Sequence, residues 1–296
     1  MITAADLRPR RSWRSTTDLV MTGLMVAAFA AVMLPLVAVM WSVISRGAGA
    51  AFASFPDFFT AEIPNISRKV GPGMGPAIVG TLLVTGGATL IAVPLGILGA
   101  IFIHEYGTHS GTHGNVAKLV RFMATVMTGV PSIVMGLFIY LVWTMHFGYS
   151  AFGGSLALSA LMLPVVIGTT EQMLRLVPDH LREAAYALGA TKSRTIVTVV
   201  LPAALPGIVS GALLAVARAA GETAPLMFAV GAATEYNPHL FDEANTSLSM
   251  QIFGNANSAF VGAQDRAWGA ALTLVLLTFL LTLVARLFTA RLALKR

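Results

Sequence analysis

Cysteine is absent from this sequence of 296 residues, and charged side chains make up only 11% of it. Without cysteine the chain has no disulfide, no thiolate metal site and no cysteine nucleophile. Soluble domains carry about 25% charged residues, so this chain has too few to cover a water-facing surface. With 56% hydrophobic residues and a mean hydropathy of +0.78, the composition predicts an integral membrane protein.

Six apolar stretches are long enough to cross a bilayer as helices, which takes about 17–25 residues each. They are continuously apolar and lack the alternation expected for strands of a membrane barrel. The fourth is the most interrupted, because Gly153, Gly154 and Pro164 fall within it. The predicted fold class is therefore an all-α polytopic membrane protein, with six transmembrane helices near 19–45, 77–103, 119–145, 151–174, 203–232 and 267–290.

Most basic residues fall on one side of the membrane when the N-terminus is placed in the cytoplasm. Of the 19, 14 then lie in inner segments and 4 in outer segments, which leaves Arg218 inside a span. Short cytoplasmic loops carry the excess of lysine and arginine, so both termini are predicted to be cytoplasmic. Topology thus accounts for the net charge of +6, and no basic run interleaved with aromatics indicates binding to nucleic acid.

The N-terminal apolar stretch has a second interpretation as a cleaved targeting signal. Arg10 and Arg11 precede it, and AGAAFA at 48–53 resembles a small-residue cleavage site. The apolar stretch at 19–45 is nevertheless far longer than the core of a signal peptide, which is about 7–15 residues. We therefore favour an uncleaved first transmembrane helix.

A charged pair interrupts the fifth span in the stretch ARAAGETAPL, residues 217–226. Arg218 and Glu222 stand four residues apart, which places them on one face of a helix near mid-depth of the predicted span. A charge at that depth costs about 2.5–3.5 kcal/mol on insertion scales and usually faces a bundle interior or a water-filled path. A buried ion pair that fixes packing is one interpretation. The favoured one is a weak anion site, in which the guanidinium binds an oxyanion and the carboxylate limits its affinity.

Hydroxyl side chains inside other spans are further candidates for the same pathway. Thr81 and Thr85 lie in the second span, Ser132 lies in the third, and Thr223 follows Glu222. Each hydroxyl can donate to an oxyanion, but bonding back to its own helix is the alternative. Small residues at spacing four, such as Ala92, Gly96 and Ala100, or Gly207, Gly211 and Ala215, predict close helix packing.

The inner segment at 177–202 predicts a short helix, a tight turn and a second helix that leads into the fifth span. Asp179 suits the first turn of the first helix, Gly189 suits its end, and Thr191 suits the cap of the next. The first helix is short and alanine-rich, which predicts a protrusion that fits a cleft on a partner. A plain helical hairpin is the alternative.

This segment resembles the signature of the membrane subunits of ABC importers, E-A-A-x3-G-x9-I-x-L-P. The chain has Glu183, Ala184, Ala185 and Gly189, then Leu201 and Pro202, with valine at 199 where isoleucine is usual. The resemblance covers about 77–290 and implies the ABC importer type I permease fold. It implies that a coupling segment at about 178–200 contacts a separate ATPase, through the five residues Glu183, Ala184, Ala185, Leu188 and Gly189.

A second resemblance concerns the substrate. R-A-x-G-E is similar to oxyanion importers generally, and GETAPL at 221–226 is similar to the A-type permeases of phosphate-specific (Pst) systems. The resemblance implies a multi-pass permease in a bacterial-type cell membrane that imports phosphate, in contact with membrane lipid. It also implies a heterodimer with a C-type permease, two ATP-binding subunits and an extracytoplasmic phosphate-binding protein. A sulfate or molybdate permease and a secondary transporter are the alternatives.

These resemblances divide the chain into segments. They are a cytoplasmic tail at 1–18, the first transmembrane helix at 19–45, an extracytoplasmic loop at 46–76, the permease domain at 77–290 and a cytoplasmic tail at 291–296. The long outer segments at 46–76 and 233–266 suit either docking or a solvated connection, and both interpretations stay open.

The sequence does not predict an enzyme. GATKS at 189–193 lacks the glycines of a phosphate-binding loop, so ATP and Mg²⁺ are expected on the partner ATPase and this chain is expected to bind no cofactor. The run HEYGTHSGTH at 104–113 does not have the HExxH spacing of zinc proteases. A metal held by His104, His109 and His113 is the alternative to a solvated loop, and we expect no metal.

Overall fold

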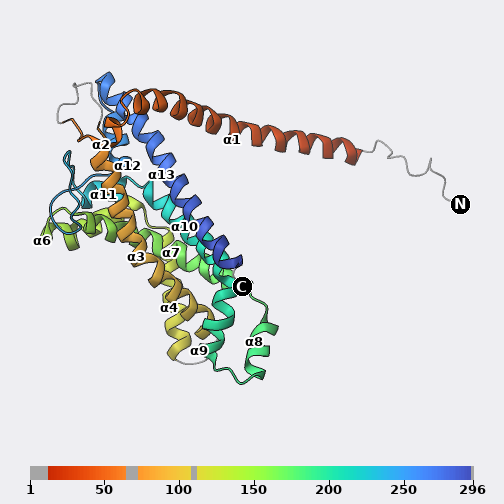
Figure 1. The fold of residues 1–296 in the computed structure, drawn as a ribbon. Helices are drawn as coiled ribbons and strands as arrows, with labels where there is room; N and C mark the ends of the chain where they lie inside the picture. The colour runs from red at the N-terminus through yellow and green to blue at the C-terminus, as the bar shows by residue number, and fades with distance from the viewer. Residues whose placement is uncertain (1–12, 65–72, 108–111, 295–296) are drawn as a thin grey trace.

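The computed structural model describes residues 13–64, 73–107 and 112–294, without the side chains of Ser15, His113 and 288–294. Within these residues all regular structure is helical, as the apolar runs predict. Figure 1 shows a bundle of long helices from which α1 projects. The elements are α1 (Trp13–Phe52), α2 (Asp57–Thr60), α3 (Gly75–Tyr106), α4 (Thr112–Thr128), α5 (Ser132–Ile139), η1 (Tyr140–Thr144, a π-helical turn), α6 (Met145–Phe147), α7 (Ala151–Arg175), α8 (Asp179–Ala187), α9 (Lys192–Thr195), η2 (Ile196–Val200, also π-helical), α10 (Leu201–Ala220), α11 (Ala224–Ala229), α12 (Leu248–Ala256) and α13 (Val261–Leu294).

Among the described residues, five helical segments are long and apolar enough to cross a membrane, or six if a bent pair of helices counts as one span. The bent pair takes the place of the span expected at 119–145, and its two arms, residues 114–128 and 132–147, meet at 109°. The break lies at Gly129, Val130 and Pro131. Proline removes a backbone donor and disfavours helical geometry at the residue before it, which explains why the chain turns here.

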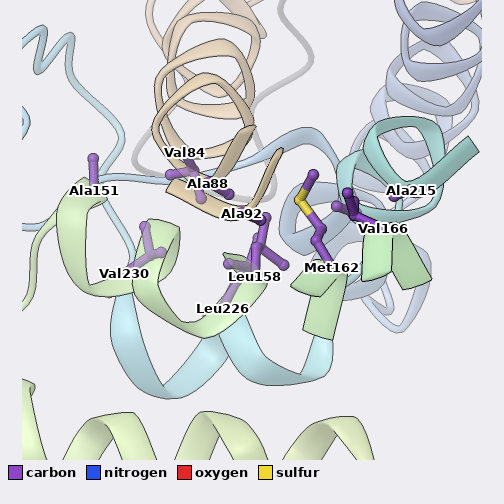
Figure 2. Close-up of a cluster of buried hydrophobic side chains, with 11 residues drawn as sticks. Val84, Ala88, Ala92, Ala151, Leu158, Met162, Val166, Ala215, Leu226 and Val230 are labelled. Carbon is purple, nitrogen blue, oxygen red and sulfur yellow. The ribbon is translucent and has the colours of Figure 1, made fainter. Parts of the chain in front are cut away.

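The core of the bundle lies between α3, α7 and α10. Figure 2 shows Val84, Ala88 and Ala92 of α3 near Leu158, Met162 and Val166 of α7 and Ala215 of α10, all of them buried. These side chains are small on α3 and larger on α7, so the two helices approach closely.

Glycines confirm that the small-residue spacing serves packing. A Cβ placed on Gly96 would lie 2.6 Å from Cγ1 of Val166, and one on Gly207 or Gly211 would overlap Met173 or Thr169 of α7. At Gly96 the neighbour is a stiff β-branched side chain, so a Cβ there would push the two helices apart, whereas the flexible Met173 opposite Gly207 can move aside.

The predicted fifth span is too long at its C-terminal end. The prediction ran to residue 232, whereas α10 ends at Ala220 and the chain bends through Gly221 into the short helix α11. Pro225 occupies the first turn of α11, where its missing N–H is tolerated and its ring cannot continue the preceding helix.

The segment after α11 folds back onto the bundle. Asn245, Thr246 and Ser247 are buried, and the amide of Asn245 donates to the carbonyl of Val230 at 2.9 Å. Thr246 packs so closely on Gly80 that a Cβ there would lie 2.0 Å from the Thr246 carbonyl oxygen. Residues 245–247 are therefore packed into the bundle and do not form a solvated connection. We call these three residues the plug.

Candidate translocation site and coupling segment

The charged pair lies at the end of a membrane helix. Arg218 stands in the last turn of α10, and its Nε lies 3.7 Å from Oε1 of Glu222. The two side chains are therefore close enough to pair, but the expectation of two charges at the middle of one continuous helix is wrong, because Glu222 lies beyond Ala220. A cation at a helix C-terminus is favoured by the unpaired carbonyls there, so this position costs less than mid-helix burial.

The two side chains differ in exposure. In the single chain the Arg218 side chain is 71% exposed, while that of Glu222 is 21% exposed. The carboxylate is thus held against the bundle and the guanidinium extends from it. A small depression beside the pair is lined by Met162 and Val165 of α7 and by Ala219 of α10. The guanidinium of Arg218 therefore lies beside a mostly apolar surface.

The first turn of α12 connects two of the predicted pathway segments. Oγ of Ser249 donates to the main-chain carbonyl of Glu222 at 2.8 Å. The hydroxyl oxygens of Ser247 and Ser249 are 3.0 Å apart. On the other side, the amide of Leu248 donates to Oγ1 of Thr81 at 2.8 Å. Sequence reasoning missed Ser249 and noted its surroundings only as a polar outer segment.

The predicted hydroxyls occupy different places. Thr81 is buried and also donates to the carbonyl of Ala77 at 2.7 Å, so its hydroxyl is engaged as the back-bonding alternative expected. Thr85 is buried one turn further along α3. Ser132 is half-buried at the start of α5, and Thr223 is half-buried directly before α11.

The last two hydroxyls belong to neighbouring helices. A Cβ on Gly136 of α5 would lie 2.5 Å from Cα of Pro225 in α11, so the two short helices are in close contact. The structure thus brings Arg218 and Glu222 together and links Thr81 to them through α12.

The coupling segment has the predicted form. α8 covers 179–187, Gly189 has a φ of +79° that permits the tight turn, and Oγ1 of Thr191 accepts from the amide of Arg194 at the start of α9. Ala185 is buried against the bundle. The remaining predicted contact residues are exposed in the single chain, and they are Glu183, Ala184, Leu188 and Gly189.

The exposed face of α8 is apolar as well as charged. Tyr186 is exposed beside Glu183, and Leu188 at the end of the helix is 90% exposed. The leucine makes this a surface that gains free energy when it is covered.

Two networks of ion pairs at this end of the bundle were missed from the sequence. Oε1 of Glu171 accepts from Arg121 at 2.7 Å and from Arg175 at 2.6 Å, which ties α4 to α7. The carboxylate of Glu105, the last acidic residue of α3, pairs with Arg182 of α8. In each case the sequence contains a single carboxylate, Glu171 or Glu105, near the end of an apolar run, and this could have indicated a buried ion pair.

The histidine-rich run does not form a metal cluster within the described residues. Nε2 of His104 lies 3.2 Å from a guanidinium nitrogen of Arg182. His109 and the side chain of His113 lie outside the described part of the chain.

Comparison with known proteins decides the family. Residues 92–295 match the family described as "Binding-protein-dependent transport system inner membrane component". This chain belongs to that family. The match begins inside α3 and includes α8, α10 and α13, so the charged pair and the coupling segment both lie within the shared region.

Two relatives are similar to this chain over most of its length. The "Phosphate transport system permease protein PstA 1" of Mycobacterium tuberculosis (strain ATCC 25618 / H37Rv) is 41% identical over 281 residues, which are 94% of this chain and 89% of the relative. The "Phosphate transport system permease protein PstA" of Yersinia pestis is 37% identical over 286 residues, covering 96% of this chain and 94% of the relative.

Solved structures confirm the type I permease fold of ABC importers. A bacterial ABC transporter involved in the import of the acidic polysaccharide alginate matches 97% of this chain and 99% of its own, with a TM-score of 0.57 and 16% identity. The MetNI methionine ABC transporter, in an inward-facing conformation, matches 73% and 91% with a TM-score of 0.52 and 18% identity. The chain is thus a multi-pass membrane permease subunit with an ABC importer fold.

Proposed function

We propose that this permease conducts inorganic phosphate across the cell membrane as part of an ATP-driven importer, and that Arg218 is the group that binds the anion. The observation that carries the proposal is the exposed guanidinium of Arg218 at the end of α10, paired with Glu222 at 3.7 Å. The names of relatives that are 34–41% identical support phosphate as the anion.

The pair suits a transient binding site. A guanidinium forms forked, charge-assisted hydrogen bonds with tetrahedral oxyanions. A pathway must also release what it binds, so an unopposed arginine would hold phosphate too tightly. Glu222 neutralises Arg218 when the site is empty and competes with the anion when it is full. Thr85, Ser132 and Thr223 are the proposed secondary donors along the path, and Thr81 holds the plug in place.

The assembly follows from the same proposal. The chain pairs with a C-type permease, receives phosphate from an extracytoplasmic binding protein and contacts one of two ATP-binding subunits through α8. Both termini lie in the cytoplasm, which places α8 on the side where ATP is available. ATP and Mg²⁺ bind to the partner subunits, and this chain carries out no hydrolysis.

Phosphate uptake by the reconstituted complex tests the role of Arg218. Charge-assisted hydrogen bonds contribute about 1.5–3 kcal/mol, so Arg218→Ala is expected to lower uptake by about ten- to a hundredfold. Arg286, which is exposed on α13, is the matched control. Arg286→Ala should transport normally, and copurification should show that both variants assemble. Undiminished uptake in Arg218→Ala would refute the proposal.

Competition identifies the anion. Unlabelled phosphate, sulfate or molybdate is added in excess to the assembled wild-type complex while uptake of labelled phosphate is measured. We expect only unlabelled phosphate to compete. Strong competition by sulfate or molybdate would assign the permease to another oxyanion.

A further inference from the structure

Arg182 links three helices at the end of the bundle where α8 lies. Its guanidinium pairs with the carboxylate of Glu105 in α3, donates to the carbonyl of Leu174 in α7 at 3.2 Å and lies 3.2 Å from Nε2 of His104. The side chains of Arg182 and Glu105 are 13% and 6% exposed. An ion pair this buried is screened little by solvent, in contrast to the usual surface pair.

Lys192 of α9, which follows the turn after α8, also binds Glu105. Its Nζ donates to the main-chain carbonyl of Glu105 and lies 4.3 Å from the ring centroid of Tyr106. Glu105 is therefore held twice, by its carboxylate from α8 and by its carbonyl from α9.

Helix ends explain why both partners are cations. The last four carbonyls of a helix have no intrahelical donor, and the C-terminus carries partial negative charge. Arg182 and Lys192 donate to such carbonyls at the ends of α7 and α3. The two cations lie on either side of the turn after α8, so α8 cannot tilt away from α3 without breaking the contacts of Arg182, while Lys192 holds the start of α9 on the same residue.

We propose that Glu105, Arg182 and Lys192 form a latch that makes α8 and α3 move as one body. This inference rests on the proposed function, in which α8 receives movement from the ATPase. α3 packs along α7 and carries Thr81, which binds the first turn of α12 next to the Ser249–Glu222 contact. The latch gives a movement of α8 a continuous route of direct contacts to the charged pair, and Arg182 acts as a positioning residue.

Distances between spin labels test whether the two helices move together. The natural chain has no cysteine, so cysteines introduced into it are unique within this subunit. One pair joins α8 to α3 (His180→Cys with Leu98→Cys) and a reference pair joins α8 to α13 (His180→Cys with Leu280→Cys), all at exposed positions. The other subunits are used in cysteine-free form, and the complex is compared without nucleotide and with ATP plus vanadate.

The latch predicts that the reference distance changes with ATP while the α8–α3 distance stays constant. In Arg182→Ala the α8–α3 distance should become broad and nucleotide-dependent. The inference would be overturned if, with Glu105, Arg182 and Lys192 all in place, ATP changed the α8–α3 distance as much as the reference distance. This readout needs ATP but no phosphate, so it can succeed even if the transported anion proves to be sulfate or molybdate.

Uptake per ATP hydrolysed provides a second readout. Arg182→Ala and Glu105→Gln should lower this ratio, because movement of α8 would no longer be passed on fully to α3. Arg182→Lys should retain part of the ratio, since its ammonium can pair with Glu105 but cannot fork onto the other acceptors. Lys118→Ala, an exposed basic residue of α4, is the control and should leave the ratio unchanged. A merely structural role would lower ATP hydrolysis and uptake together and keep their ratio, and that result would also overturn the inference.

Discussion

Ser249 holds the main chain of Glu222 through a hydrogen bond of 2.8 Å from its Oγ to the Glu222 carbonyl. The bond joins α12, which follows the buried plug, to the residue that pairs with Arg218. The helix α12 and the link between α10 and α11, whose bonded residues are 27 positions apart in the chain, thus meet at the candidate site.

Removal of that bond should weaken transport while the subunit still assembles. A hydrogen bond contributes about 0.5–1.5 kcal/mol, so Ser249→Ala is expected to lower phosphate uptake by up to about tenfold. Ser210→Ala is the control, because the Ser210 hydroxyl donates to Pro206 on its own helix at 2.9 Å. Equal uptake by the two variants would mean that the bond has no part in positioning Glu222.

Exchange of the charged pair separates packing from transport. The double variant Arg218→Glu with Glu222→Arg keeps an ion pair at the end of α10 but removes the guanidinium from its position. We expect copurification with the other subunits to be normal, and uptake to be as low as in Arg218→Ala. If transport recovers with assembly, the pair serves packing and the anion is bound elsewhere.

Two glycines of α3 form a matched test of the α3–α7 contact. A Cβ on Gly96 would lie 2.6 Å from Cγ1 of Val166, whereas one on Gly86 would meet nothing within 4 Å. Overpacking costs about 1–3 kcal/mol, so Gly96→Ala should lower the thermal unfolding temperature of the purified protein in detergent. Gly86→Ala should leave it unchanged or raise it, since alanine is the better helix former by about 1 kcal/mol. The reverse order would contradict the close approach of the two helices.

The exposed end of α8 should matter for the ATPase and not for the fold. Burial of a leucine side chain contributes about 1.5–3 kcal/mol, so Leu188→Ala is expected to weaken binding of the ATP-binding subunit by about ten- to a hundredfold. Leu90→Ala, on an exposed position of α3, is the control. Binding is measured by titration of the ATP-binding subunit onto the permease dimer in nanodiscs. Equal affinity for both variants would move the docking surface away from Leu188.

The sequence alone determined the fold class and most of the coupling segment. Apolar length and the shortage of charge predict membrane helices, because only helices and closed barrels satisfy the backbone in lipid and these runs lack the alternation of barrel strands. The helix, the turn at Gly189 and the cap at Thr191 were predictable, since their signals are local. The pairing of Arg218 with Glu222 was predictable from their spacing for the same reason.

Tertiary structure decided where helices break and which distant side chains meet. Pro131 and Pro225 mark positions where a helix can break, but the angle of 109° and the close contact of α5 with α11 appear only in the packed structure. The bonds of Glu105 with Arg182 and of Ser249 with Glu222 span 77 and 27 residues. Hydropathy and spacing describe residues that are close along the chain. A buried cation or hydroxyl must find a polar partner, and packing of the helices decides which distant residue provides it.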